Sequence, residues 1–206
     1  MIIIVVTTIS IFIIYEKNNP NYYKFISIGD GLALGLNPLG VKSYNYNDYL
    51  KEHLENNGKN VKYYNYSEKN LSISELTNDL IYLKDEKLKE YIKTSNLIIL
   101  SIGEKEIEEN KELNTIEENL QNLIFEIKKY NSNICLLGRY NNDKELINKI
   151  DEINDMYKKI AQKNNIIYIN INENNYYSNN TFNYPTIGIY KEISSMIIAA
   201  MHLNKA

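Results

Sequence analysis

The sequence predicts a three-layer α/β/α sandwich around a five-stranded parallel sheet. Short apolar runs rich in β-forming residues alternate with longer segments whose apolar residues recur at helical spacing. This strict alternation implies right-handed crossovers between parallel strands, with helices covering both faces of the sheet. A length of 206 residues and a hydrophobic content of 44% suit one globular domain with a proper core.

Five buried strands are expected, each six or seven residues long, at 24–29, 61–66, 96–102, 133–138 and 165–170. Helices with one apolar face are expected between and after them, at 45–56, 72–93, 113–130, 144–164 and 188–202. No internal repeat or long low-complexity segment interrupts this order.

The first fifteen residues differ from the rest of the chain, because they contain no charged side chain. As a helix they would span roughly 22 Å, short of the ~30 Å hydrocarbon core of a bilayer. We interpret 1–15 as an N-terminal membrane anchor or signal-like segment, 16–23 as a linker and 24–206 as the domain. The expected location is a membrane-anchored, extracytoplasmic domain at a bacterial cell surface. The alternative is that 1–15 form a buried first strand or helix of the fold.

Composition limits the chemistry. The net charge is −3, and Arg139 is the one arginine, so no basic face suggests a nucleic-acid partner. A single cysteine, Cys135, excludes a disulfide framework and a multi-cysteine zinc site. The two histidines, His53 and His202, lie in the first long helix and near the C-terminus, so neither is expected to be catalytic. We expect no metal site and no cofactor.

Function is expected in the loops at the carboxyl ends of the strands, where ligands bind in parallel sheets. Five of the eight glycines lie in the first and third of these loops, at positions 29, 31, 35, 40 and 103. Glycine there allows the backbone to approach a ligand closely, or to adopt a positive φ angle, or simply to make a tight turn without any ligand.

The first loop, Gly29 to Gly35 (GDGLALG), resembles the opening Gly-Asp-Ser-Leu-x-x-Gly block of the SGNH/GDSL hydrolases. It matches at every defined position except the serine, which is replaced by Gly31. Leu97 to Glu106 (LIILSIGEKE) resembles the family's strand-3 block, which ends Gly-x-Asn-Asp. Gly103 is kept there, and Lys105 and Glu106 replace the Asn and Asp.

The segment from Asn174 to Ile193 resembles the family's last block, which carries the catalytic aspartate and histidine. The aligned positions include Tyr176, Tyr177, Asn179, Pro185 and Tyr190. This register puts Phe182 at the aspartate position and Tyr184 at the histidine position. The resemblance covers about residues 24–200 and implies the SGNH-hydrolase fold, which is flavodoxin-like.

In that family a serine attacks an ester carbonyl, a histidine takes its proton and an aspartate orients the histidine. Here Gly31 has no nucleophile, Phe182 accepts no hydrogen bond, and Tyr184, with an ordinary tyrosine pKa near 10, is no base at neutral pH. The catalytic positions are therefore degenerate, and the leading hypothesis is a pseudoenzyme that binds or scaffolds. The residues expected to line the remnant site are Gly29, Asp30, Gly31, Ser67, Gly103, Lys105 and Tyr184.

Two alternatives stay open. In the first, the chain is an active esterase that uses other groups, with Ser27, Ser43, Ser67 or Ser101 as nucleophile and Glu104, Lys105 or Glu106 in acid-base roles. The simpler interpretation of Glu104–Glu109 (EKEIEE) is a solvated helix start. In the second, Gly29-x-Gly31 opens a phosphate or nucleotide site, although Gly35 comes one residue too late for the dinucleotide fingerprint.

Tyrosine is unusually common, with 19 residues, and many of them follow the predicted strands. Aromatic rings beside Asn side chains suit sugars, so a glycan or an acylated cell-wall ligand is the expected partner class. The alternative is that tyrosine packs the remnant pocket shut. In that case a role in protein interaction or structure would replace small-molecule binding. The sequence does not predict the oligomeric state.

Overall fold

The computed structural model describes residues 22–82, 86–140, 147–172 and 184–203. Its five strands form one parallel sheet in the order β2-β1-β3-β4-β5. The strands are β1 (Tyr22–Gly29), β2 (Asn60–Ser67), β3 (Leu97–Ser101), β4 (Ile134–Leu137) and β5 (Ile167–Ile169). All five predicted strands are confirmed, with ends shifted by at most two residues. β1 begins at Tyr22, so the last two residues of the expected linker belong to the sheet.

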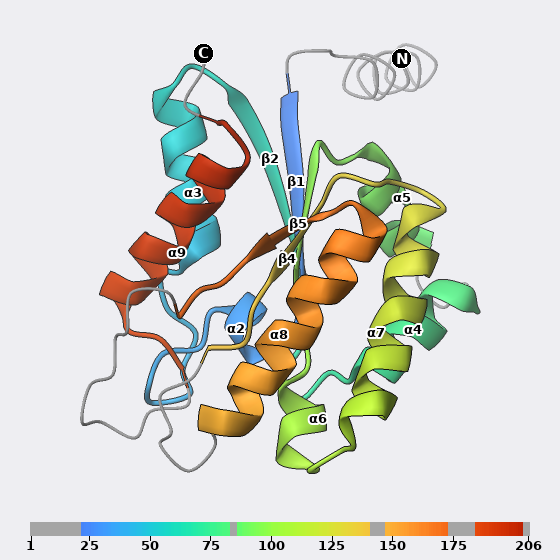
Figure 1. The fold of residues 1–206 in the computed structure, drawn as a ribbon. Coiled ribbons are helices and arrows are strands. Elements are labelled where there is room, and N and C mark those ends of the chain that lie inside the picture. The colour runs from blue at the N-terminus through green and yellow to red at the C-terminus, as the bar shows by residue number, and fades with distance from the viewer. Residues whose placement is uncertain (1–21, 83–85, 141–146, 173–183, 204–206) are drawn as a thin grey trace, which may run out of the picture.

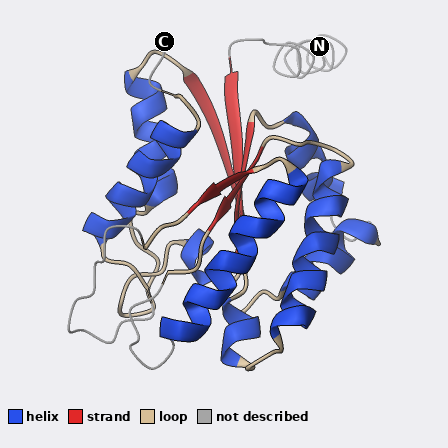
Figure 2. Ribbon diagram, viewed as in Figure 1, coloured by secondary structure: helices blue, strands red, loops and turns tan. Residues whose placement is uncertain are grey.

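Helices cover both faces of the sheet, as Figures 1 and 2 show. The longer helices on one face are α3 (Tyr46–Asn56) and α9 (Ile187–Ala200). Those on the other face are α4 (Ile73–Ile81), α5 (Glu86–Thr94), α7 (Leu113–Lys128) and α8 (Ile147–Asn164). Two short helices, α2 (Gly31–Leu34) and α6 (Glu104–Glu108), follow β1 and β3. The predicted three-layer sandwich is therefore confirmed.

The sheet separates two apolar cores because successive side chains of a strand point to opposite faces. Ile26 and Ile28 of β1 pack with α4, α7 and α8 on one side. Phe25 packs with α3 and α9 on the other. β3 follows the same rule, with Ile98 and Leu100 in the first core and Leu97 and Ile99 in the second.

Two helical predictions need correction. The segment expected as one helix over 72–93 forms two helices, α4 and α5. The first ends at Ile81, with Tyr82 as its C-cap, and the second begins at Glu86. The segment Glu104–Glu109, expected as a solvated start to the next helix, forms the separate helix α6, and its side chains Glu104 and Glu106 are buried. Both carboxylates receive backbone N–H donors from other segments, which offsets the cost of burial.

Candidate functional site

The remnant site lies at the carboxyl edge of the sheet, where β1 passes into α2. Asp30 is the N-cap of this one-turn helix, and its Oδ1 accepts a hydrogen bond from the backbone N–H of Leu32 at 3.3 Å. Gly35 ends the helix in the left-handed conformation, with a φ of 85°. The block that carries the sequence resemblance thus forms a strand, a cap and a single helical turn.

Gly29 is required by contact with the neighbouring strand. Its φ is 148°, and a Cβ at this position would lie 1.7 Å from the carbonyl oxygen of Ser101 in β3. The same oxygen accepts a hydrogen bond from the N–H of Asp30 at 3.0 Å. The glycine therefore serves close packing of β1 on β3 and needs no ligand to explain it.

A buried ion pair holds Asp30 in place. Its Oδ2 accepts from Nη1 of Arg139 at 2.8 Å and from the backbone N–H of Glu104 at 2.9 Å. The two side chains are 0% and 7% exposed. Burial raises the pKa of the Asp30 carboxyl to about 6, and the Arg139 charge opposes that rise. Asn154 fixes Arg139 in turn, because its side-chain amide bonds both the N–H and the carbonyl of Arg139.

The Glu104 carboxylate occupies the space beside Gly31. Its Oε2 accepts a hydrogen bond from the backbone N–H of Gly31 at 3.0 Å, and its Oε1 accepts from the hydroxyl of Tyr184. All three residues are buried, with Glu104 8% and Tyr184 7% exposed. The loop amide that stands at the serine position is thus bound to a carboxylate of the same chain.

No room remains for a serine side chain at position 31. A Cβ added to Gly31 would lie 2.5 Å from Cε1 of Tyr184 and 2.7 Å from Oε2 of Glu104. Such distances are well below van der Waals contact. Tyr184 is also no base, because burial and the Glu104 carboxylate raise the pKa of its phenol. The remnant site is therefore filled by side chains. Of the two alternatives that the sequence left open, a pocket for a sugar or a pocket packed shut, the structure shows the second around Gly31.

Lys105, expected to line the remnant site, forms its side-chain contacts with α4. Its Nζ lies 3.0 and 3.1 Å from the two carboxylate oxygens of Glu75 in α4. Glu106 faces α4 as well, where its Oε1 accepts from the N–H of Ile73 at 2.8 Å. Neither Lys105 nor Glu106 is hydrogen-bonded to Gly31 by its side chain. The side chain that reaches the loop of Gly31 is that of Glu104, one position earlier.

Gly103 and Ser67, two further residues expected at the site, lie after β3 and at the end of β2. Gly103 has a φ of 121°, and a Cβ there would lie 2.3 Å from the hydroxyl of Tyr157. Ser67 pairs with Gly29 in the register of β1 and β2. Its Oγ is buried without a hydrogen-bond partner among the described residues. Phe182, Tyr176, Tyr177 and Asn179 lie outside the described residues.

The other candidate serines do not meet a base. The Ser27 hydroxyl lies 2.8 Å from the hydroxyl of Tyr46. Ser43 donates to the carbonyl of Gly35, and the Oγ of Ser101 has no partner among the described residues. His53 bonds Asn57 within the C-terminal part of α3. A serine nucleophile activated by an adjacent base is therefore not formed by these side chains in this structure.

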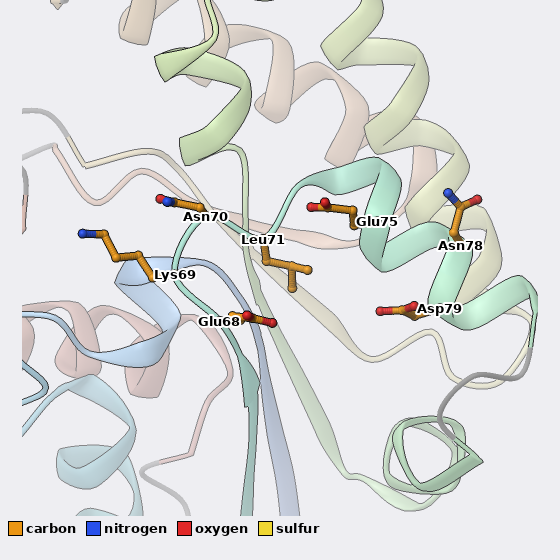
Figure 3. A pocket seen from close by; sticks show the side chains of 7 residues that line it. All are labelled: Glu68, Lys69, Asn70, Leu71, Glu75, Asn78 and Asp79. Carbon is orange, nitrogen blue, oxygen red and sulfur yellow. The ribbon is translucent and has the colours of Figure 1, made fainter.

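A polar groove of about 290 Å³ opens next to the filled site. Figure 3 shows it between the loop after β2 and helix α4, with the carboxylates of Glu75 and Asp79 pointing toward the loop. The lining residues are Glu68, Lys69, Asn70, Leu71, Glu75, Asn78 and Asp79. Most of these side chains are charged or carry an amide, so the groove offers hydrogen-bond partners and little apolar surface.

Tyrosines near the site mostly pack. Tyr46 and Tyr190 are fully buried, and Tyr190 donates its hydroxyl to the carbonyl of Leu36. Tyr63 stacks on Phe25 and Tyr64 stacks on Tyr91. The sequence left open whether tyrosines line an open pocket or pack, and these residues pack.

Among residues 22–82, 86–140, 147–172 and 184–203, no group of three or more His, Cys, Asp or Glu side chains could hold a metal ion. The same residues contain no helix that is both long and apolar enough to cross a membrane. The apolar segment 1–15 lies outside this described part.

Comparison with known proteins places the fold. In sequence, no family model and no curated protein matches the chain. In structure, a catalytic mutant of Axe2, an acetylxylan esterase from Geobacillus stearothermophilus, matches with a TM-score of 0.70 at 15% identity, covering 87% of this chain and 94% of the other. The chain has the fold of the SGNH/GDSL esterases.

Two other solved structures agree. LAE5, an alpha/beta hydrolase from the metagenome of Lake Arreo, has a TM-score of 0.71 at 14% identity, covering 89% of this chain and 97% of its own. A protein from Desulfitobacterium hafniense, described as lipolytic and of the G-D-S-L family, has a TM-score of 0.68 at 15% identity, with 86% and 99% covered. The SGNH/GDSL esterase fold predicted from the sequence is therefore confirmed.

The sequence did not predict Arg139 as a residue of this site, and it offered Glu104 only as an acid-base group in the alternative of an active esterase. Two sequence signals could have pointed to Arg139, because it is the one arginine in the chain and lies two residues after the end of β4. Its pairing with Asp30 joins residues 109 positions apart, which no local pattern reveals. Glu104 is the first of several glutamates, and nothing in the sequence separates the buried ones from the solvated ones.

Proposed function

We propose that this chain is a non-catalytic protein of the SGNH/GDSL esterase fold, which binds or scaffolds and does not hydrolyse esters. The observation that carries this proposal is the occupied serine position. Gly31 has no hydroxyl, and the space for one is taken by Tyr184 and Glu104. Loss of an activated nucleophile removes several orders of magnitude of rate in triad hydrolases.

The backbone N–H of Gly31 also supports a non-catalytic role. An ester-hydrolysing site needs backbone N–H groups aimed at a developing negative charge. Here the N–H of Gly31 donates to the Glu104 carboxylate, so a negative charge of the protein already holds that donor. A phosphate would need the same N–H and would be repelled by the carboxylate, so the nucleotide hypothesis gains no support from this loop.

The activity test uses the full chain with p-nitrophenyl acetate and acetylated xylo-oligosaccharides, next to an active esterase of this fold as positive control. We expect no turnover above that of heat-denatured protein. Saturable turnover that disappears in Tyr184→Phe or Glu104→Gln would overturn the proposal and favour the alternative of an esterase that uses non-standard residues.

A glycan or acylated cell-wall ligand remains the proposed partner class, and the groove of Figure 3 is the place that supports it. Sugar hydroxyls bind side-chain carboxylates and amides, and Glu68, Asn70 and Asp79 offer these groups. Titration calorimetry with xylo-oligosaccharides and peptidoglycan fragments tests this role. We expect Asp79→Asn to weaken binding and Asp48→Asn, in the first turn of α3, to leave it unchanged. No measurable heat with any of these ligands would contradict the glycan role.

We also propose that residues 1–15 attach the domain to a membrane, with the domain on the extracytoplasmic side. Two facts support this. The segment has no charged residue, and the described sheet has its five strands without it. Fractionation of cells that produce the full chain tests the attachment. Recovery of the chain in the soluble fraction without detergent would contradict it.

A further inference from the structure

We propose that the amino edge of the sheet rests on an anionic phospholipid bilayer. We define the amino edge as the first three residues of each strand, the last turn of α3, α5, α7, α8 and α9, and the described loops that lead from these helices into strands. The proposal rests on the membrane attachment proposed above for residues 1–15, and it goes further by naming the surface of the domain that meets the lipid.

The short segment between residue 15 and Tyr22 limits how far the amino edge can lie from residue 15. Seven residue steps separate residue 15 from Tyr22, the start of β1. A fully extended chain covers at most about 3.6 Å per residue, so Tyr22 lies within about 25 Å of residue 15. Tyr22 pairs with Asn60, which brings the start of β2 to the same place. Figure 1 shows the starts of β1 and β2 and the end of α5 at the upper edge of the molecule.

The charge of the amino edge is complementary to an anionic surface. Its acidic side chains are Glu55 and Glu126. Its basic side chains are Lys24, Lys59, Lys62, Lys93, Lys128, Lys129 and Lys163. The chain as a whole has a net charge of −3, so the excess of lysine is a property of this edge and not of the protein. Clusters of lysine beside a membrane segment are attracted by anionic lipid headgroups.

Aromatic side chains accompany these lysines. Phe125 in the last turn of α7 is 62% exposed, and the Lys129 Nζ lies 4.8 Å from its ring centroid. The Nζ of Lys62 lies 4.5 Å from the Tyr22 ring centroid. Aromatic rings favour the headgroup level of a bilayer, and lysine side chains reach past them to the phosphates. An exposed phenylalanine among lysines is well placed for that contact.

The chain contains no tryptophan, so one introduced tryptophan reports on one place. We would place it at the amino edge with Phe125→Trp and, as control, at the opposite end with Leu39→Trp, which replaces a side chain that is 82% exposed. The full chain is mixed with vesicles of brominated phosphatidylcholine, with or without 30% phosphatidylglycerol. We expect bromine to quench the tryptophan at 125 at least twice as strongly as the one at 39, in anionic vesicles only.

Charge reversal provides the second arm. The pair Lys93→Glu and Lys129→Glu should reduce quenching at 125 by half or more, as should 0.5 M salt. The matched pair Lys42→Glu and Lys111→Glu, at the opposite end of the sheet, should leave it unchanged.

The outcomes separate the two proposals. A chain that sediments with vesicles but shows equal quenching at 125 and 39, or none at 125, overturns the lipid-facing edge and leaves membrane attachment standing. Equal quenching at 125 with and without phosphatidylglycerol also overturns it, since charge would then play no part. A chain that stays in the supernatant overturns both proposals.

Discussion

The hydroxyl of Tyr184 donates a hydrogen bond to the carboxylate of Glu104, and together the two side chains fill the space where esterases of this fold are expected to carry a serine. The contact joins residues 80 positions apart. It links the loop before α9 to the start of α6, and Glu104 extends the link to the backbone of Gly31.

Restoring the serine should therefore harm the fold without restoring activity. Gly31→Ser places atoms against Tyr184 and Glu104, and overpacking of this kind costs about 1–3 kcal/mol. We expect a lower midpoint of thermal unfolding and no esterase activity. Gly188→Ser in the first turn of α9 is the matched control, because the nearest atom to its Cβ is 3.9 Å away. Equal stability of the two variants would contradict the filled site.

Removing the Tyr184 hydroxyl should destabilise the protein. Tyr184→Phe leaves a buried oxygen of Glu104 without this donor, which costs about 1–3 kcal/mol. Tyr44→Phe is the control, since Tyr44 donates to Glu52 on the surface and is 45% exposed. Urea denaturation of both variants measures the difference. The hydrogen bond would have no stabilising role if Tyr184→Phe unfolded at the wild-type urea concentration.

The pair of Asp30 and Arg139 should show strong coupling. Asp30→Asn leaves the buried guanidinium without a counter-charge, and breaking one side of such a pair costs about 3–5 kcal/mol. The double variant Asp30→Asn, Arg139→Met removes both charges and should regain much of that loss. A double-mutant cycle by chemical denaturation measures this. Single-variant costs that simply add would contradict the coupling.

Glu75 should make stability depend on pH in the acid range. Hydrogen bonds from Ser72 and Lys105 lower the pKa of its carboxyl to about 2. A carboxylate whose pKa is lowered by folding stabilises the folded state above its unfolded pKa, near 4.5, and this stabilisation is lost as the pH falls toward 2. Ser72 and Glu75 form a capping box at the start of α4, in which each side chain accepts from the backbone N–H of the other. Glu75→Gln can keep this capping box but loses the pH-dependent effect.

The measurement is the free energy of unfolding of the wild type minus that of Glu75→Gln, taken from pH 2 to pH 7. We expect this difference to be near zero at pH 2 and to grow until about pH 5. Glu118→Gln, on the exposed face of α7, serves as the control and should show a flat difference. A flat profile for Glu75→Gln would contradict the role of its hydrogen bonds.

The fold was predictable from local patterns because each element carries its own periodicity. The continuous apolar run from Leu97 to Leu100 predicts a buried strand, and the spacing of Ile116, Leu120 and Leu123 predicts a helix with one buried face. The break between α4 and α5 was not predictable in this way, because apolar residues at helical spacing continue on both sides of it.

The sequence by itself determined the strand order along the chain, the helices between the strands and the absence of serine and histidine at positions 31 and 184. Only the tertiary structure decided what replaced them. Glu104, Tyr184 and Arg139 come from three segments that are distant in sequence, and they meet because parallel strands bring their carboxyl ends to one edge. Glu104 can be buried beside Gly31 because its carboxylate receives donors there, from the Gly31 amide and the Tyr184 hydroxyl.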